Sequence, residues 1–222
     1  MTQKYYMVVI FLFFGCNTSR NSSDKISFPK EPIRDLEYGF TLEGIDIDIY
    51  KKFGVLTKLK LLKNTRMIYE YDNIDEFYLD SIQTYVFRQD GGNCFDVLFE
   101  GPTSPNKSVL NRIQICNDSV ISISKIPTFE SLPKNLDEDE NLEVAGVWSW
   151  FEFFGANNDS TSYNPILYYE ISKNGLKLDT LLTVSKNAEI YGYFYGYNYS
   201  EKQSQPSSIM KKFDLEIERI NK

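Results

Sequence analysis

Histidine is absent from all 222 residues of the chain. This absence excludes Ser-His-Asp and Cys-His catalytic groups, imidazole general bases and zinc sites with His ligands. Basic residues are also outnumbered, because 24 Lys and Arg stand against 31 Asp and Glu. We do not expect such an acidic chain to bind nucleic acid or to adhere to anionic lipid by charge. The sequence predicts no catalytic residue, no metal ligand and no cofactor.

A long hydrophobic run is missing as well. The longest apolar run, Tyr5–Phe14, has ten residues, whereas a membrane-spanning helix needs about 20. Lys4 precedes this run, Gly15 and Cys16 follow it, and the chain is polar afterwards. A charged start, a short apolar core and a small residue before the cut are typical of a secretory signal peptide, here residues 1–15.

The end of this signal, Leu12-Phe13-Phe14-Gly15-Cys16, resembles the lipobox of bacterial lipoproteins. The family prefers Leu three places before the cysteine, where this chain has Phe13. The resemblance implies cleavage before Cys16 and acylation of that residue by palmitate-like chains. Two or more acyl chains hold a protein stably on a membrane. An ordinary secretory signal and an uncleaved anchor are the alternatives.

The resemblance also implies a location. In related lipoproteins an acidic run directly after the cysteine favours export to the cell surface, and none follows Cys16. We therefore expect the protein in the bacterial cell envelope, anchored in the outer membrane and facing the periplasm, with surface exposure as the alternative. Residues 16–35 are polar and contain two prolines, which predicts a flexible tether. Residues 36–222 are expected to form one globular domain, with a subdivision near 127–143.

Aromatic residues are frequent, with 16 Tyr and 16 Phe. Aromatic and β-branched residues in short runs between polar breaks indicate sheet. We predict a mainly β fold, an antiparallel sandwich or an up-and-down barrel-like sheet with one or two short helices. An α+β fold is the alternative. A short helix is expected over 73–82, and strands are expected over 144–154, 166–172, 176–184, 190–199 and 210–220, the last with a helix as alternative.

Three cysteines are present, and Cys16 is assigned to lipid. The other two, Cys94 and Cys116, end two alternating segments that fold into a hairpin with the cysteines opposite each other. The same register places Phe95 opposite Ile115 and collects the apolar residues on one face, so a slip by one residue would break both agreements. In an oxidising envelope this pair is expected to form a disulfide.

The candidate binding surface is aromatic. On a strand over 190–199 five tyrosines would share one face, and two tryptophans would share a face of another strand. Aromatic rings stack on sugars and on partner proteins at a small entropy cost. The alternative is that these rings belong to the core. The residues are Tyr191, Tyr193, Tyr195, Tyr197, Tyr199, Trp148 and Trp150.

Two acidic patterns are weaker. Asp46 and Asp48 would share a strand face, as the paired carboxylates of a glycosidase do, but a solvated strand face is the simpler interpretation. Asp137, Asp139 and Asn141 match the start of a calcium-binding loop, yet its sixth and twelfth positions do not match. A solvated acidic loop is therefore expected there, with a weak calcium contact as the alternative.

These observations favour a non-enzymatic, lipid-anchored envelope protein that binds a protein or a glycan. A carboxylate-dependent hydrolase acting on glycans is one alternative. An inhibitor or immunity-type envelope protein is another, permitted by the acidity and the lack of a catalytic motif.

Overall fold

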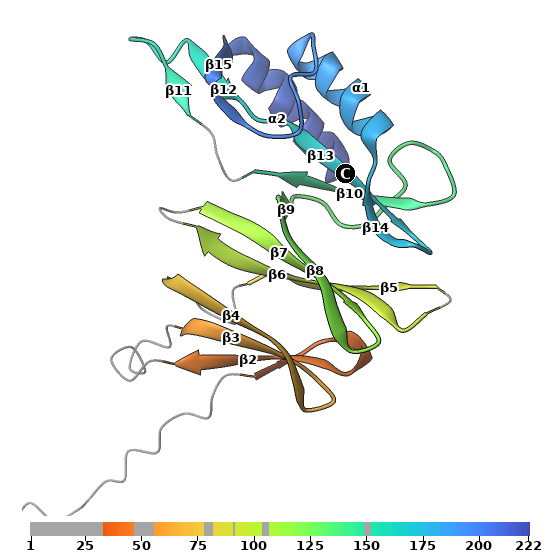
Figure 1. Cartoon of the computed structure of the whole chain (residues 1–222). Coiled ribbons are helices and arrows are strands. Elements are labelled where there is room, and N and C mark those ends of the chain that lie inside the picture. Colours follow the sequence, from red (N-terminus) through yellow and green to blue (C-terminus); the bar gives the residue numbers. More distant parts are fainter. Residues whose placement is uncertain (1–32, 47–55, 78–81, 91, 104–106, 149–151) are drawn as a thin grey trace, which may run out of the picture.

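In a computed structural model of the chain, the described residues are 33–46, 56–77, 82–90, 92–103, 107–148 and 152–222. They form four antiparallel sheets, two α-helices and one short 3-10 helix. The prediction of a mainly β fold with one or two short helices is confirmed. Three of the sheets lie one above another, as in the sandwich alternative, and the helices cover the last of them (Figure 1).

The N-terminal sheet forms one end of this stack. Its strands, in spatial order, are β1 (Ile33–Asp35), β2 (Phe40–Asp46), β3 (Leu56–Lys63) and β4 (Arg66–Phe77), with the 3-10 helix η1 (Glu37–Gly39) between β1 and β2. Residues 33–35, expected in the tether, pair with β2. The short helix expected over 73–82 is wrong at its start, because β4 continues to Phe77, which pairs with Leu56. Residues 78–81 lie outside the described residues.

The middle sheet confirms the predicted hairpin. Its strands, in order, are β5 (Thr84–Gln89), β6 (Cys94–Thr103), β7 (Lys107–Cys116) and β8 (Ser119–Ile126). Cys94 pairs with Cys116, and Phe95 pairs with Ile115, as the sequence pattern requires. The disulfide is formed, with Cα atoms 4.1 Å apart and a sequence separation of 22 residues.

The C-terminal sheet follows along the chain. Its strands, in order, are β14 (Gly175–Leu178), β13 (Ile166–Ser172), β10 (Leu142–Val147) and β9 (Thr128–Phe129). A small fourth sheet contains β11 (Phe153–Phe154), β12 (Ser160–Tyr163) and β15 (Ser200–Pro206). The strand expected over 166–172 is confirmed as β13. The single strand expected over 144–154 is wrong, because β10 ends at Val147 and residues 149–151 lie outside the described part.

Helix α1 (Thr180–Tyr191) replaces the ends of two predicted strands, over 176–184 and 190–199. Asp179 caps its start by accepting a hydrogen bond from the Leu182 amide at 2.9 Å. The side that α1 turns to the sheet is partly polar: the Thr183 hydroxyl accepts from the Tyr168 amide, and the Asn187 side chain bonds both backbone groups of Ile166. Because the buried side of α1 contains these polar residues, the segment lacks the apolar periodicity that predicts a helix.

Helix α2 (Ser208–Ile220) occupies the segment for which the strand was favoured over the helix, so that preference is wrong. Phe213 and Ile220 are buried, and Ile209 and Ile217 pack partly against the same core. This spacing matches a helix face, because residues three and four apart lie above one another. Within the described residues, neither α-helix is long and apolar enough to cross a lipid bilayer.

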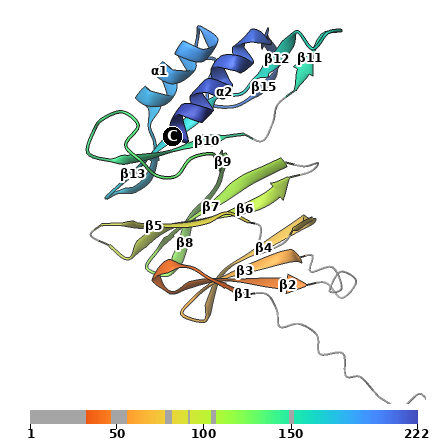
Figure 2. The same cartoon turned by 180° about the vertical axis from the view of Figure 1, so that it is seen from behind.

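The views from the front and from behind show the sheets and helices stacked in layers (Figures 1 and 2). Three hydrophobic cores lie between these layers. The first lies between the N-terminal and middle sheets and contains Phe95, Val97 and Phe99 of β6. The second lies between the middle and C-terminal sheets and contains Leu98 of β6. The third lies under the helices. Alternate residues of β6 thus enter different cores, so this strand is buried on both faces.

Candidate binding surface

Helix α1 ends where the tyrosine-rich segment begins. Gly192 has a φ of 77°, and its amide donates to the Ala188 carbonyl at 2.8 Å. This left-handed C-cap reverses the chain at little steric cost, because glycine has no Cβ. Residues 192–199 then run without regular structure to β15 (Figure 1). The predicted strand over 190–199, with five tyrosines on one face, is therefore wrong.

Tyr191 belongs to the core. It is 6% exposed, and its hydroxyl donates to the Asn164 carbonyl at 2.7 Å. Its ring meets that of Tyr163 edge to face at 4.8 Å. Burial raises the pKa of Tyr191, and the hydrogen bond to Asn164 opposes that rise. A buried, hydrogen-bonded phenol supports the helix and offers no surface to a partner.

Two buried or half-buried aromatic side chains hold the backbone of the segment in place. The Tyr163 hydroxyl donates to the Gly196 carbonyl at 2.7 Å. The Trp148 indole donates to the Tyr197 carbonyl at 3.1 Å. Trp148 and Tyr197 also pack against the core between the middle and C-terminal sheets. The segment is thus tied to two cores at successive residues, although it has no strand or helix partner of its own.

Three tyrosines of this segment face solvent, and we call them the tyrosine surface: Tyr193, Tyr195 and Tyr199. They are 65%, 38% and 36% exposed. Tyr193 and Tyr195 meet edge to face at 5.2 Å, and Tyr195 meets the buried Tyr163 ring at 5.3 Å. Tyr199 meets Trp148 at 6.5 Å. Each exposed ring therefore rests on another ring, which limits its rotamers and prepares it for contact with a ligand.

The sequence pattern identified these tyrosines but placed them on a strand, which is wrong. Of the seven aromatic residues that it proposed, Tyr191 is buried, Trp148 and Tyr197 are half-buried, and Trp150 lies outside the described residues. The glycine that ends α1 was the available signal, since Gly after a helical stretch is typical of a C-cap. It was masked by the alternation of tyrosine with other residues over 191–199.

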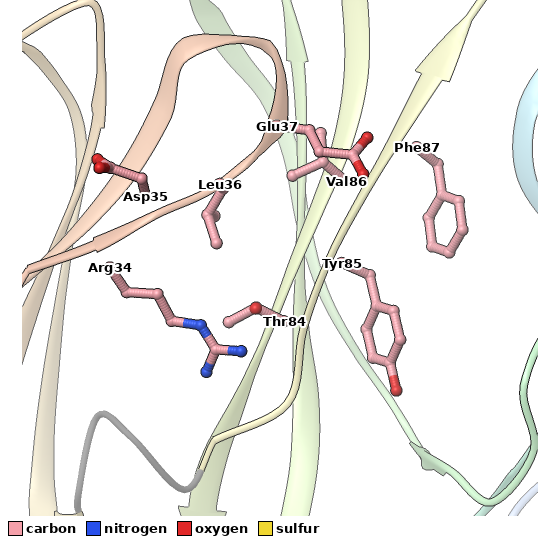
Figure 3. Close-up of a pocket in the computed structure, with 8 residues that line it drawn as sticks. All are labelled: Arg34, Asp35, Leu36, Glu37, Thr84, Tyr85, Val86 and Phe87. Atoms are coloured by element: carbon pink, nitrogen blue, oxygen red, sulfur yellow. The ribbon is translucent and has the colours of Figure 1, made fainter.

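A pocket of about 440 Å³ lies between β1, η1 and β5. Figure 3 shows Arg34 pointing toward Thr84, and Tyr85 and Phe87 on the opposite side of β5; all four residues line the pocket. The Arg34 guanidinium donates to the Ile82 carbonyl at 2.6 Å. Burial, followed by the charges of Glu100 and Glu130, raises the pKa of Tyr85.

This pocket is a packing gap between two edge strands. β1 and β5 each end their sheets, and the guanidinium that enters the gap already serves a backbone carbonyl. The charged side chains of Asp35 and Glu37 line it together with the apolar Leu36 and Val86. We assign no catalytic role to this arrangement, because the lining holds no nucleophile paired with a base.

The glycosidase-like pair is not assembled within the described residues. Asp46 ends β2, and Asp48 lies outside the described part of the chain. Comparison of the chain with protein-family models, with curated proteins and with solved structures found no match. Among the described residues, the tyrosine surface is the feature that bears on function.

Proposed function

We propose that the protein is a lipid-anchored component of the bacterial cell envelope that binds a protein or a glycan through its tyrosine surface without catalysing a reaction. The observation that carries the binding proposal is the exposure of Tyr193, Tyr195 and Tyr199 on a segment held by hydrogen bonds from Trp148 and Tyr163. Exposed tyrosines supply large, amphipathic contact areas with few rotatable bonds, and such residues are enriched in binding surfaces.

The anchor proposal rests on the apolar run Tyr5–Phe14 and on Cys16 directly after Gly15. A diacyl or triacyl group on Cys16 would supply the membrane affinity, at about 0.8 kcal/mol for each buried CH₂. The chain enters the described domain at β1, in the N-terminal sheet, whereas the tyrosine surface lies in the C-terminal layer at the other end of the stack (Figure 2). An anchor before β1 therefore leaves this surface available to partners away from its attachment point.

The anchor is tested by metabolic labelling with a fatty acid in cells that express the full chain. We expect label in the wild-type protein and none in Cys16→Ser. Globomycin, which blocks cleavage of lipoprotein signals, should make the wild-type protein accumulate as the larger precursor. Absence of label, together with an unchanged size under globomycin, would contradict the anchor.

The binding surface is tested by placing a photo-crosslinking amino acid at Tyr193 in the full chain. Leu181 is a matched control, because it lies on the neighbouring helix and is 83% exposed. We expect a discrete crosslinked product in intact envelopes from position 193 and none from position 181. Digestion of the product by a protease or by glycan hydrolases then identifies the class of partner. Equal products from both positions, or none from either, would contradict a specific tyrosine surface.

A further inference from the structure

The connector between β9 and β10 is closed into a loop by its ends. Lys134 and Glu143 form an antiparallel bridge, with the Lys134 amide donating to the Glu143 carbonyl at 3.0 Å and the reverse bond at 2.8 Å. Asp137 and Asp139 lie on the exposed part of this loop, and Glu143 lies on β10 at its base. The bridge therefore holds three carboxylates from one short segment near one another.

Glu143 is the unusual member, because its residue is fully buried at 0% exposure. Its Oε2 accepts a hydrogen bond from the Leu136 amide at 2.7 Å, whereas its Oε1 is buried with no hydrogen-bond partner among the described residues. Buried polar oxygens in folded proteins almost always have a partner. An unpaired oxygen on a buried carboxylate costs folding free energy unless a cation or another donor occupies the adjacent space.

The three side chains also converge. One carboxylate oxygen of each of Asp137, Asp139 and Glu143 lies within 4.8 Å of the corresponding oxygens of the other two. Oxygens on opposite sides of a Ca²⁺ ion are about 4.6–5.2 Å apart, since each lies about 2.3–2.6 Å from the ion. The spacing thus fits a shared ion. In the described part of the chain, no Lys or Arg forms an ion pair with any of the three.

Charge supports the same conclusion. The three carboxylates lie close together and carry like charges, so they repel one another. A divalent cation would favour the ionised form of each and relieve the repulsion among all three groups.

We propose that Asp137, Asp139 and the free oxygen of Glu143 bind one Ca²⁺ ion at the base of this loop. The ligands are all carboxylate oxygens, which suits a hard cation and not zinc or copper. Water fills the remaining positions on the exposed side. This site differs from the calcium loop that the sequence failed to match, because Glu143 is the seventh residue counted from Asp137, not the twelfth. Three carboxylates on a partly exposed loop suit an affinity of about 10⁻⁴–10⁻³ M, as in extracellular calcium modules.

The test uses the full chain, purified in detergent, stripped of metal with a chelator and titrated with CaCl₂ or MgCl₂. Calorimetry should show one saturable calcium site. At a calcium concentration fifty-fold above Kd, we expect the melting temperature to rise by about 4–9 °C. Mg²⁺ at the same concentration should give less than half of this rise, because it demands near-octahedral ligands and holds its own waters.

Paired variants separate a site from general acidity. Asp137→Asn with Asp139→Asn should lower the calcium affinity at least ten-fold and remove the thermal shift. Glu138→Gln with Glu140→Gln is the matched control, because it removes the same charge from exposed positions of the same loop and should keep the response. No calcium heat in the wild type, an equal shift with Mg²⁺, or an equal loss in both double variants would each overturn the proposal.

Discussion

Asp96 and Arg112 form an ion pair inside the protein that also joins two of its sheets. The Arg112 Nε donates to the Asp96 Oδ1 at 2.9 Å, and Asp96 is 0% exposed. The other oxygen of Asp96 accepts from the Leu176 amide at 3.0 Å, and Arg112 donates to the Leu176 carbonyl at 2.5 Å. Both backbone groups of one β14 residue are therefore bound by an ion pair of the middle sheet.

This junction predicts a large effect from breaking the pair. Asp96→Ala leaves Arg112 without its counter-charge and the Leu176 amide without its acceptor, so we expect a loss of about 3–5 kcal/mol in the free energy of unfolding. Urea unfolding followed by fluorescence measures it. Asp72→Asn is the control, because Asp72 pairs with Lys58 on the surface at 2.7 Å and its loss should cost much less stability. Similar losses in both variants would contradict a structural role for the buried pair.

Gly175 tests the same junction from the backbone side. Its φ is 88°, and a Cβ there would lie 2.6 Å from the Asp96 Oδ2. Gly175→Ala should therefore cost about 1–2 kcal/mol for the left-handed conformation and a further 1–3 kcal/mol for displacing the Asp96 carboxylate. Gly192 has a φ of 77°, and a Cβ there would meet no atom within 4 Å. Gly192→Ala should therefore show the cost of the left-handed backbone alone. Equal destabilisation in the two variants would show that the carboxylate moves aside freely.

The Cys94–Cys116 disulfide in the middle sheet should contribute measurably to the free energy of unfolding. Replacing both Cys94 and Cys116 with Ala should lower the free energy of unfolding by about 3 kcal/mol, because the bridge closes a loop over a sequence separation of 22 residues in the unfolded chain. Urea unfolding of the wild type under reducing conditions should give the same loss. A double variant as stable as the oxidised protein would contradict this prediction.

The contact between Glu216 of α2 and Tyr168 of the C-terminal sheet should be sensitive to acid. Burial raises the pKa of Glu216, but hydrogen bonds from Arg219 and from the Tyr168 hydroxyl outweigh it, so the pKa lies below the ordinary value of 4.5. A lowered pKa gives stability above pH 4.5 that is lost as the pH falls through the folded-state value. Glu216→Gln should therefore be about 1–3 kcal/mol less stable than the wild type at pH 7.

The pH profile is the decisive part of that measurement. The stability difference between the wild type and Glu216→Gln should shrink below pH 4.5, as the wild-type carboxyl takes up its proton. Chemical unfolding at pH 7, 5, 4 and 3 measures the difference. Glu218→Gln is the control, since Glu218 is largely exposed and pairs with Lys222 at 3.7 Å. A constant difference across this range would show that the charge of Glu216 is not involved.

The sequence predicted the β6–β7 hairpin correctly because two independent constraints agreed. The opposition of Cys94 and Cys116 and the alternation of apolar residues both require one register, and a shift by one residue violates both. The mainly β class followed from the same alternation in several segments. The local sequence pattern was sufficient to predict a strand or helix wherever the apolar face of that element is also its buried face.

Helix α1 was missed, and helix α2 was only the alternative to a strand, because the apolar and buried faces of these segments do not coincide in this way. α1 turns Thr183 and Asn187 toward the sheet, where they satisfy backbone groups of β13, and its apolar Leu181 faces solvent. A polar buried side and an exposed leucine do not produce the helical period that sequence reasoning seeks. In α2 the alternation of Phe213, Leu215 and Ile217 imitates a strand, although Leu215 is exposed.

The tyrosine surface was named from the sequence but not placed by it. Its positions depend on hydrogen bonds from Tyr163 and Trp148, which are 33 and 49 residues away along the chain. No short-range pattern encodes such contacts. The sequence pattern likewise did not include Glu143 with Asp137 and Asp139. The bridge between Lys134 and Glu143 brings its carboxylate close to the other two.

The central claim is that a fatty-acylated cysteine attaches the folded domain to a membrane. Mass spectrometry of the N-terminal peptide from the mature protein, purified from membranes of a bacterium that makes lipoproteins, tests it most directly. The account predicts a chain that begins at Cys16 and carries the mass of a diacylglyceryl group, with or without a further acyl chain. A mature chain that begins at another residue, or a Cys16 without added mass, would contradict it.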